Sequence, residues 1–258
     1  MNQVASQGRV YLVGAGPGDP GLLTVRALSI LESADQVYYD QLVTPEILSL
    51  ARPGCEMVNV GHRAGYTARN LVAVAQRMAE AARRGLLVAR LKGGDPFLLG
   101  RGGEEVQALV QAGVGVEVVP GVSSAIAGPA AAGIPVTHRG VAASVAVVSG
   151  HRCDEEGGID WSRLHADTVV VLMASKRLQR IASAMTAAGW SPETPAAVIM
   201  AATTARQRQV MAPLCRIAAA AAAAMMEAPA LLVVGEVVAV GAGSGSGGAA
   251  PESGFSGS

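Results

Sequence analysis

The sequence contains few cysteines, and their number and spacing exclude two kinds of site. Cys55, Cys153 and Cys215 are odd in number and lie far apart, so they form neither a disulfide framework nor the short spacing of a structural metal site. We therefore expect no metal, and we expect a reducing, cytoplasmic setting.

The sequence also lacks an excess of charge and a long apolar run. Its 20 basic residues balance 20 acidic ones, which argues against a nucleic acid or an acidic membrane recognised by bulk charge. The longest apolar run near the C-terminus, Ile217 to Met226, is shorter than the roughly 20 residues that a membrane span needs. The N-terminal residues do not resemble a signal peptide. These absences predict a soluble globular protein.

Strand patterns alternate with helical patterns along the chain, which is typical of α/β proteins with parallel sheets. The alternation is looser in the second half, where the last predicted strand covers Ala230 to Val240, and this leaves room for antiparallel pairing. Between Ala125 and Pro135 the sequence is small, apolar and interrupted by glycine and proline, which indicates a domain junction. We predict an N-terminal arm, two α/β domains and a flexible Gly/Ser-rich tail at residues 1–9, 10–130, 131–240 and 241–258.

A glycine-rich stretch, Gly14 to Gly21, follows the first predicted strand and precedes a helical pattern. It departs from the dinucleotide fingerprint G-x-G-x-x-G, because Asp19 stands at the position of the third glycine. An acid at a helix start repels a pyrophosphate and complements the helix dipole. The stretch therefore fits a cationic or zwitterionic ligand better than a dinucleotide.

The most informative stretch is RLKGGDPFLLGRGGEE, from Arg90 to Glu105. An apolar strand ends there in Gly93 and Gly94, which let the backbone turn and come close to a ligand. A purely structural turn between a strand and a helix is the alternative, but such turns are usually only a few residues long. The stretch is more typical of a ligand loop at the end of a strand.

Two further polar residues are expected at the same edge of the predicted sheet. Asp40 follows a short strand from Gln36 to Tyr39, at the edge where open α/β sheets bind ligands, and it is either a catalytic or binding acid or a helix cap. His62 lies in GHRAGY after the next strand. A structural or solvated histidine is the alternative to a catalytic one.

Six motifs occur together along the chain, in the order GAGPGDPGLLT, YYDQLV, GHRAG, RLKGGDPFLLGRGGEE, VVPGVSSA and GIPVTHR. Together they resemble the tetrapyrrole methylase family, and within it the uroporphyrinogen-III C-methyltransferases. The resemblance runs from about Val10 to Val240. It implies a class III methyltransferase fold, with two α/β domains and S-adenosylmethionine bound in the cleft between them. It also implies a homodimer.

The resemblance further implies which residues hold the cofactor. Glycines permit close backbone approach, and Leu98 and Met173 offer apolar walls for the adenine, although a core position is as good an account of Met173. Relatives carry a polar, glycine-containing segment where this chain has MAATT, so Ala202 is expected to contact the cofactor through its backbone. The full set is Pro17, Gly93, Gly94, Asp95, Leu98, Ser123, Ser124, Met173 and Ala202.

The implied reaction transfers two methyl groups in succession to ring carbons of uroporphyrinogen III and gives precorrin-2 and S-adenosylhomocysteine. Asp40 is the expected proton acceptor, and His62 stands where many relatives carry a lysine thought to donate a proton. The substrate carries several carboxylates, which guanidinium groups can grip bidentately. Glu104 either accepts from a pyrrole N–H or only complements a helix dipole. The expected substrate-binding residues are Arg63, Arg101, Glu104, Arg139 and Arg152.

Three alternative functions remain at this stage. A methyltransferase acting on a later corrin intermediate would carry similar cofactor loops. A non-catalytic protein that binds a tetrapyrrole or a nucleotide would not depend on the acids of the cleft. An NAD-dependent oxidoreductase is disfavoured by Asp19. The product would be common to siroheme, cobalamin and other modified-haem pathways, and because no dehydrogenase or ferrochelatase segment is fused to the chain, we expect later steps to belong to other proteins.

Overall fold

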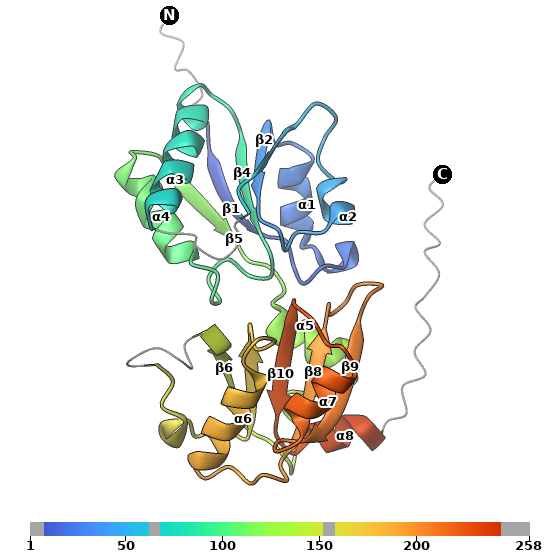
Figure 1. Ribbon diagram of the computed structural model, residues 1–258. Coiled ribbons are helices and arrows are strands. Elements are labelled where there is room, and N and C mark those ends of the chain that lie inside the picture. The colour runs from blue at the N-terminus through green and yellow to red at the C-terminus, as the bar shows by residue number, and fades with distance from the viewer. Residues whose placement is uncertain (1–7, 62–67, 152–157, 244–258) are drawn as a thin grey trace, which may run out of the picture.

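The computed structural model describes residues 8–61, 68–151 and 158–243. These residues form two five-stranded sheets, which lie one above the other in Figure 1. The first sheet takes its strands from residues 10–119 and the second from residues 145–234. The predicted α/β architecture is confirmed.

The first sheet is entirely parallel. In spatial order its strands are β3 (Glu56–Asn59), β2 (Gln36–Tyr39), β4 (Val88–Lys92), β1 (Val10–Gly14) and β5 (Val116–Val119). Because every strand runs the same way, the loops that follow them all leave the sheet at one edge. In the described part of the chain, that edge carries the glycine-rich stretch after β1, Asp40 after β2, the glycine loop after β4 and the residues from Pro120 after β5.

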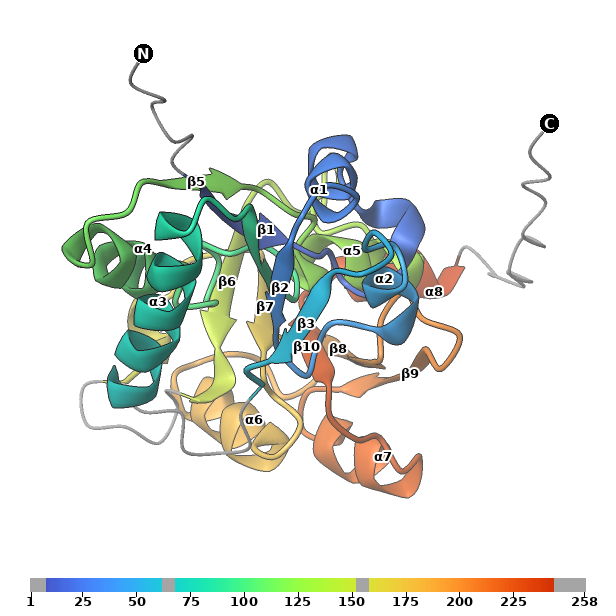
Figure 2. The same ribbon diagram turned by 90° about the horizontal axis from the view of Figure 1, so that it is seen from above.

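Each face of the first sheet is covered by a different pair of helices, because alternate side chains of an apolar strand point to opposite faces. The short helix η1 (Pro20–Leu22) leads into α1 (Val25–Leu31), which covers one face together with α2 (Pro45–Leu48). Figure 2 shows α3 (Ala68–Arg83) and α4 (Gly102–Gln111) on the other face.

The second sheet is mixed. Its strands, in spatial order, are β6 (Val145–Ser149), β7 (Thr168–Leu172), β10 (Ala230–Val234), β8 (Pro195–Met200) and β9 (Arg208–Pro213). β6 and β7 pair in parallel, and the remaining pairs are antiparallel. The looser alternation in the second half of the sequence left room for antiparallel pairing, and such pairing is present. β6, β7 and β8 run in the same direction, so they end at the same edge of the sheet.

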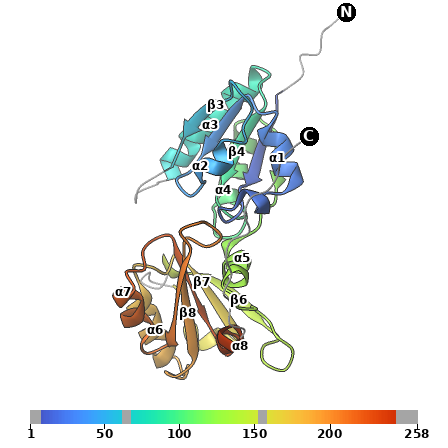
Figure 3. The ribbon, with the colours of Figure 1, turned by 90° about the vertical axis from the view of Figure 1, so that its right-hand side faces the viewer.

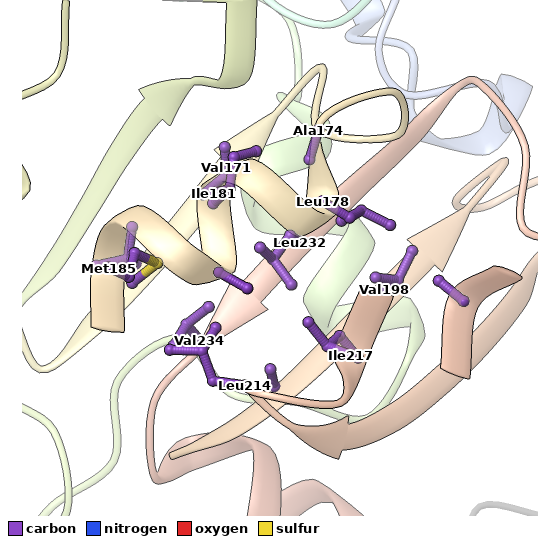
Figure 4. Close-up of a cluster of buried hydrophobic side chains, with 14 of the residues drawn as sticks. Val171, Ala174, Leu178, Ile181, Met185, Val198, Leu214, Ile217, Leu232 and Val234 are labelled. Carbon is purple, nitrogen blue, oxygen red and sulfur yellow. The ribbon is translucent and has the colours of Figure 1, made fainter. Parts of the chain in front are cut away.

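Helices also cover both faces of the second sheet. α6 (Leu178–Ala187) and α7 (Ile217–Ala223) lie on one face, and α5 (Ser124–Ala131) and α8 (Val237–Gly243) on the other (Figure 3). Apolar side chains fill the layer beneath α6 and α7 (Figure 4). Trp161, from the short helix η3 (Trp161–Arg163), belongs to the same cluster. In the described part of the chain, no helix combines the length and apolar character needed to cross a bilayer.

The chain departs from the predicted elements at two places. A single strand over Ala230–Val240 was a wrong prediction: β10 ends at Val234, Gly235 adopts a φ of +145°, and the chain continues as α8. The expected junction contains α5, and both Ala125 of this helix and its C-cap residue Ala132 pack into the core of the second sheet. The domain boundary at residue 130 itself stays a prediction.

The exposed carboxylate of Asp167 joins the chain before β6 to the chain before β7. It accepts hydrogen bonds from the backbone N–H groups of Ala143 and Ser144 at 2.8 and 3.0 Å and from the Ser144 hydroxyl at 2.8 Å. These bonds, the one from Ala143 first, lower the pKa of Asp167 below its ordinary value of 3.8. A carboxyl group whose pKa is lower in the folded state than in the unfolded state stabilises the fold at pH values above its unfolded-state pKa.

We therefore predict that Asp167→Asn lowers the free energy of unfolding by a constant amount between about pH 5 and pH 7. This difference in the free energy of unfolding should shrink as the pH falls below 3.8 and passes the lowered pKa of Asp167 in the folded state. At such pH values the wild-type carboxylate becomes protonated and loses its charge. Urea unfolding of both proteins across this range measures the effect. A deficit that stays the same down to about pH 2 would contradict it.

Candidate active site

The loops that follow β1, β4 and β5 meet through their backbones. Gly16 and Gly94 pair in both directions, with N–H to carbonyl-oxygen distances of 3.2 and 2.7 Å. A Cβ atom on Gly14 would lie 2.5 Å from the backbone nitrogen of Gly121, and one on Gly121 would lie 2.7 Å from the Cα of Gly14. These distances are too short for a side chain, so the close approach requires glycine at both positions.

Beside this contact, the glycine loop leaves space over Gly94. Gly94 has a φ of +70°, and the nearest atom to a Cβ built there would be the Cα of Ser123, at 3.9 Å. Ser123 caps α5 by accepting a hydrogen bond from Ala125 N–H at 3.1 Å, and Ser124 is the first residue of that helix. Gly93, Gly94, Ser123 and Ser124 are thus brought together around a backbone that a ligand can approach closely.

The carboxylate of Asp95 binds the backbone of the loops. Its Oδ1 accepts from Phe97 N–H at 2.8 Å, and its Oδ2 accepts from Gly121 N–H at 3.0 Å. The second bond ties the loop after β4 to the loop after β5. Asp95 therefore stabilises the arrangement of the loops, while its contact with a cofactor stays a prediction.

Asp40 lies at the end of β2, against the glycine loop. Its side chain is 24% exposed, its Oδ1 accepts from Leu42 N–H at 3.0 Å, and a Cβ atom on Gly93 would lie 3.8 Å from the same oxygen. The alternative role as a helix cap is wrong, because the N-cap of α2 is Thr44. Asp40 is held beside the glycine loop with part of its carboxylate accessible.

A buried ion cluster lies behind Asp40, and the sequence motifs did not predict it. Both oxygens of Glu105 accept from Arg90, at 3.1 Å from Nε and 3.1 Å from Nη2, and Oε1 also accepts from Lys92 Nζ at 2.8 Å. Arg90, Lys92 and Glu105 are 4%, 5% and 2% exposed. Arg90 Nη1 lies 4.0 Å from Asp40 Oδ2. We call Arg90, Lys92 and Glu105 the buried triad.

The sequence contained a signal for the buried triad. Arg90 and Lys92 stand two positions apart in an otherwise apolar strand, so they point to the same face of the sheet, and buried cations need an acidic partner.

Burial, followed by the nearby charge of Arg90, lowers the pKa of Lys92 below its ordinary 10.5, although Glu105 acts in the opposite direction.

Arg101 and Glu104 form an exposed ion pair, with 3.1 Å between Nε and Oε1. Partial burial acts to raise the pKa of Glu104, but hydrogen bonds from its own N–H and from Arg101 outweigh it and bring the pKa below 4.5. Leu99 and Arg101 have φ angles of 55° and 58°, a strained conformation that clusters at functional sites. These residues line a hollow of about 520 Å³ together with Phe97, Gly102, Gly103 and Ser149.

The second sheet supplies the facing side of the site. Ser149, which lines the hollow, ends β6. Met173 follows β7 with a φ of 58° and is 37% exposed, so the alternative that it belongs to the core is wrong. Ala202 follows β8 between Ala201 and Thr203, whose φ angles are also positive.

The first glycine-rich stretch reaches this facing side. Asp19 N–H donates to Thr203 Oγ1 at 3.2 Å, and a Cβ atom on Gly18 would lie 3.7 Å from the carbonyl oxygen of Ala202. Pro17, next to Gly18, is half-buried. Leu98, from the loop after β4, packs against the core of the second sheet. The structure therefore brings the predicted residues of both sheets to one region.

Arg139 is the remaining predicted residue that the structure describes. It is exposed, in a turn closed by a hydrogen bond from His138 N–H to the carbonyl oxygen of Ala142 at 2.9 Å. His62, Arg63 and Arg152 lie outside the described residues.

Known proteins resemble this chain over most of its length. The family model of tetrapyrrole (corrin/porphyrin) methylases matches residues 9–218. The S-adenosyl-L-methionine-dependent uroporphyrinogen III methyltransferase of Methanosarcina barkeri is 45% identical over 235 residues, which cover 90% of this chain and 92% of that protein.

Solved structures also resemble this chain over most of its length. The uroporphyrin-III C-methyltransferase of Thermus thermophilus, complexed with S-adenyl homocysteine, has a TM-score of 0.76 and 44% identity, over 90% of this chain and 94% of that one. A cobalt precorrin-4 methyltransferase has a TM-score of 0.80 and 28% identity, over 92% and 99% of the two chains.

Because the loops after β1 and β5 are in contact, we predict that two glycine substitutions change the free energy of unfolding by different amounts. Gly121→Ala places a methyl group against the Gly14 backbone, so we expect the free energy of unfolding to fall by about 1–3 kcal/mol. Gly115→Ala is the matched control, because a Cβ atom there meets nothing within 4 Å, and the stability should be unchanged or up to about 1 kcal/mol higher. Equal stabilities of the two variants in urea unfolding would contradict the close approach.

Proposed function

Since the chain belongs to the tetrapyrrole (corrin/porphyrin) methylase family, we propose that it C-methylates uroporphyrinogen III twice, with S-adenosylmethionine as donor, to give precorrin-2 and S-adenosylhomocysteine. The observation that carries this proposal is the 45% identity to a uroporphyrinogen III methyltransferase over nearly the full length of both chains. Identity to a methyltransferase of a later intermediate, cobalt precorrin-4, is 28%. The earlier substrate is therefore favoured.

The residues around Gly94 fit a bound S-adenosylmethionine. A Cβ atom on Gly94 would enter free space next to Ser123, so the backbone is open to a ligand at this point, and exposed Met173 offers an apolar surface from the second sheet. The backbone carbonyl of Ala202 lies close to Gly18. We assign the cofactor to Pro17, Gly93, Gly94, Asp95, Leu98, Ser123, Ser124, Met173 and Ala202.

S-adenosylmethionine supplies a methyl group on a sulfonium, which is already a good leaving group, so the proposed transfer needs no activating metal. The protein contributes alignment of the substrate and removal of a proton. Asp40 is the proposed proton acceptor, since its carboxylate is partly exposed and its Oδ1 is oriented by Leu42 N–H at 3.0 Å. His62 is the proposed second catalytic residue.

The acidic substrate is assigned to the hollow beside the glycine loop. Arg101 and Glu104 line it, and a substrate carboxylate would compete with Glu104 for the Arg101 guanidinium, which binds carboxylates well. Glu104 would then accept from a pyrrole N–H. Arg63, Arg139 and Arg152 are the proposed additional contacts for substrate carboxylates.

The quaternary and domain organisation are also proposals. We propose a homodimer, as the family resemblance implies, and two domains that cover residues 10–130 and 131–240. The cofactor would lie between them, which agrees with the hydrogen bond from Asp19 to Thr203 and with the packing of Leu98 on the core of the second sheet.

The direct test of the function is an anaerobic incubation with S-adenosylmethionine and uroporphyrinogen III, followed by mass spectrometry. We expect a product with two added methyl groups. Absence of any methylated product would overturn the proposal. Binding of S-adenosylhomocysteine without turnover would instead favour a carrier, and methylation of a later corrin intermediate alone would favour the other enzymatic function.

We predict that Asp40→Asn lowers kcat by about 100-fold or more, because the amide keeps the shape of the side chain but cannot accept the proton. His62→Lys should retain activity, since lysine stands at this position in many relatives. Release of S-adenosylhomocysteine under saturating substrates measures both variants. A fully active Asp40→Asn enzyme would remove Asp40 from the mechanism.

Substitutions in the two halves of the loop should separate the ligands. Gly94→Val fills the free space and strains a backbone with positive φ, so the Kd of S-adenosylhomocysteine should rise by about tenfold or more. Arg101→Ala should leave that Kd unchanged and raise the KM of uroporphyrinogen III. Calorimetry and steady-state kinetics measure the two effects, and equal changes for both ligands in both variants would contradict the assignment.

A further inference from the structure

Glu105 joins both ends of the loop that separates β4 from α4. It belongs to the first turn of α4, while its partners Arg90 and Lys92 lie on the last residues of β4. Three donors reach its carboxylate, at 3.1, 3.1 and 2.8 Å, and the side chain is 3% exposed. A carboxylate in this position can fix the partner groups but cannot contact a ligand.

Arg90 extends this link to the end of β2. The side of its guanidinium that Glu105 does not hold is Nη1, which donates to the carbonyl oxygens of Leu91 at 2.9 Å and Tyr38 at 3.4 Å. The same Nη1 lies 4.0 Å from Asp40 Oδ2. The bidentate bond to Glu105 acts together with these two carbonyl oxygens to orient the cation that faces Asp40, because a planar guanidinium held at two nitrogens has a fixed orientation.

The charges of the buried triad do not cancel within it. Arg90 and Lys92 are cations, and Glu105 is their buried anion. Among the described residues, Asp40 is a further acid that forms an ion pair with the triad, at 4.0 Å from Arg90. Buried charges need partners, and the Asp40 carboxylate is one partner for the excess positive charge of the triad; the charge of Lys92 also helps to lower the pKa of Glu104.

The cofactor half of the loop is held by other bonds. Gly94 pairs with Gly16, Ala15 N–H donates to the carbonyl oxygen of Lys92 at 2.7 Å, and Asp95 accepts from Gly121 at 3.0 Å. None of these four bonds uses the Glu105 carboxylate. Loss of that carboxylate should therefore disturb Asp40 more than the backbone around Gly94.

From these contacts, and resting on the function proposed above, we infer that Glu105 is a positioning residue for the methyl transfer. It acts through Arg90 on Asp40: the bidentate Arg90–Glu105 pair holds the guanidinium that fixes the Asp40 carboxylate beside Gly93. The role differs from the complementing of a helix dipole, which an exposed acid in the same turn would serve equally well.

The first test compares two variants, of which only one keeps the bidentate Arg90–Glu105 pair. Lys92→Met keeps the bidentate Arg90–Glu105 pair. The double variant Lys92→Met/Glu105→Gln removes one charge of each sign relative to the wild type, so it avoids leaving two buried cations without an anion. We expect the double variant to have a kcat about 10–100-fold below that of Lys92→Met, with a Kd for S-adenosylhomocysteine that changes by less than about threefold.

The second test asks whether Glu105 acts through Asp40. In an Asp40→Asn, Lys92→Met background, Glu105→Gln should cause little further loss of kcat, because the carboxylate that it positions is absent. A residue with only a structural role would lower the residual activity by the same factor in both backgrounds. Glu117→Gln, which removes an exposed ion pair with Arg26, is the control for loss of a glutamate charge and should keep the wild-type kcat.

Two results would overturn the inference. One is an equal kcat for Lys92→Met and the double variant. The other is an equal loss from Glu105→Gln with and without the Asp40 carboxylate. Both results are measured on an enzyme whose wild type is active. If the proposed function were wrong, the wild type itself would give no methylated product, so the two failures can be distinguished.

Discussion

The site depends on how closely the backbones of three loops approach one another at the edge of a parallel sheet. Gly14 and Gly121 contact each other with no room for a side chain, and Gly94 pairs with Gly16 through both of its backbone groups. Parallel strands bring these loops to the same edge, and glycine lets them touch. Backbone contacts thus fix the loop geometry and leave the Gly94 backbone open to a cofactor.

A buried triad of charges supports the same loop from behind. It spans from β4 to α4 and faces Asp40, while exposed Arg101 and Glu104 lie farther along the loop. We propose that this segment serves two ligands by different means: its glycine half would offer backbone to the cofactor, and its arginine half would offer charge to an acidic macrocycle. The second sheet completes the region with Met173 and Ala202.

Much of this arrangement could be predicted from the sequence, because its causes are local. Alternating strand and helix patterns predicted the α/β sheets, and the sequence also predicted that the backbone turns at Gly94, where φ is +70°; ligand binding by this loop stays a prediction. Glu105 was not predicted, because its partners lie on another element and an acid in the first turn of a helix already has a local explanation. Met173 shows the same limit, since only its positive φ and its exposure distinguish it from a core methionine.

We propose that loops from both sheets form one ligand site around Gly94. Backbone hydrogen exchange with and without S-adenosylhomocysteine tests it most directly. We expect the backbone amides of residues 93–100, 123–124 and 201–203 to become protected together, while those of β3 and α7 do not change. If all three loops stayed unprotected at saturating ligand, the loops would not form a common site for this ligand.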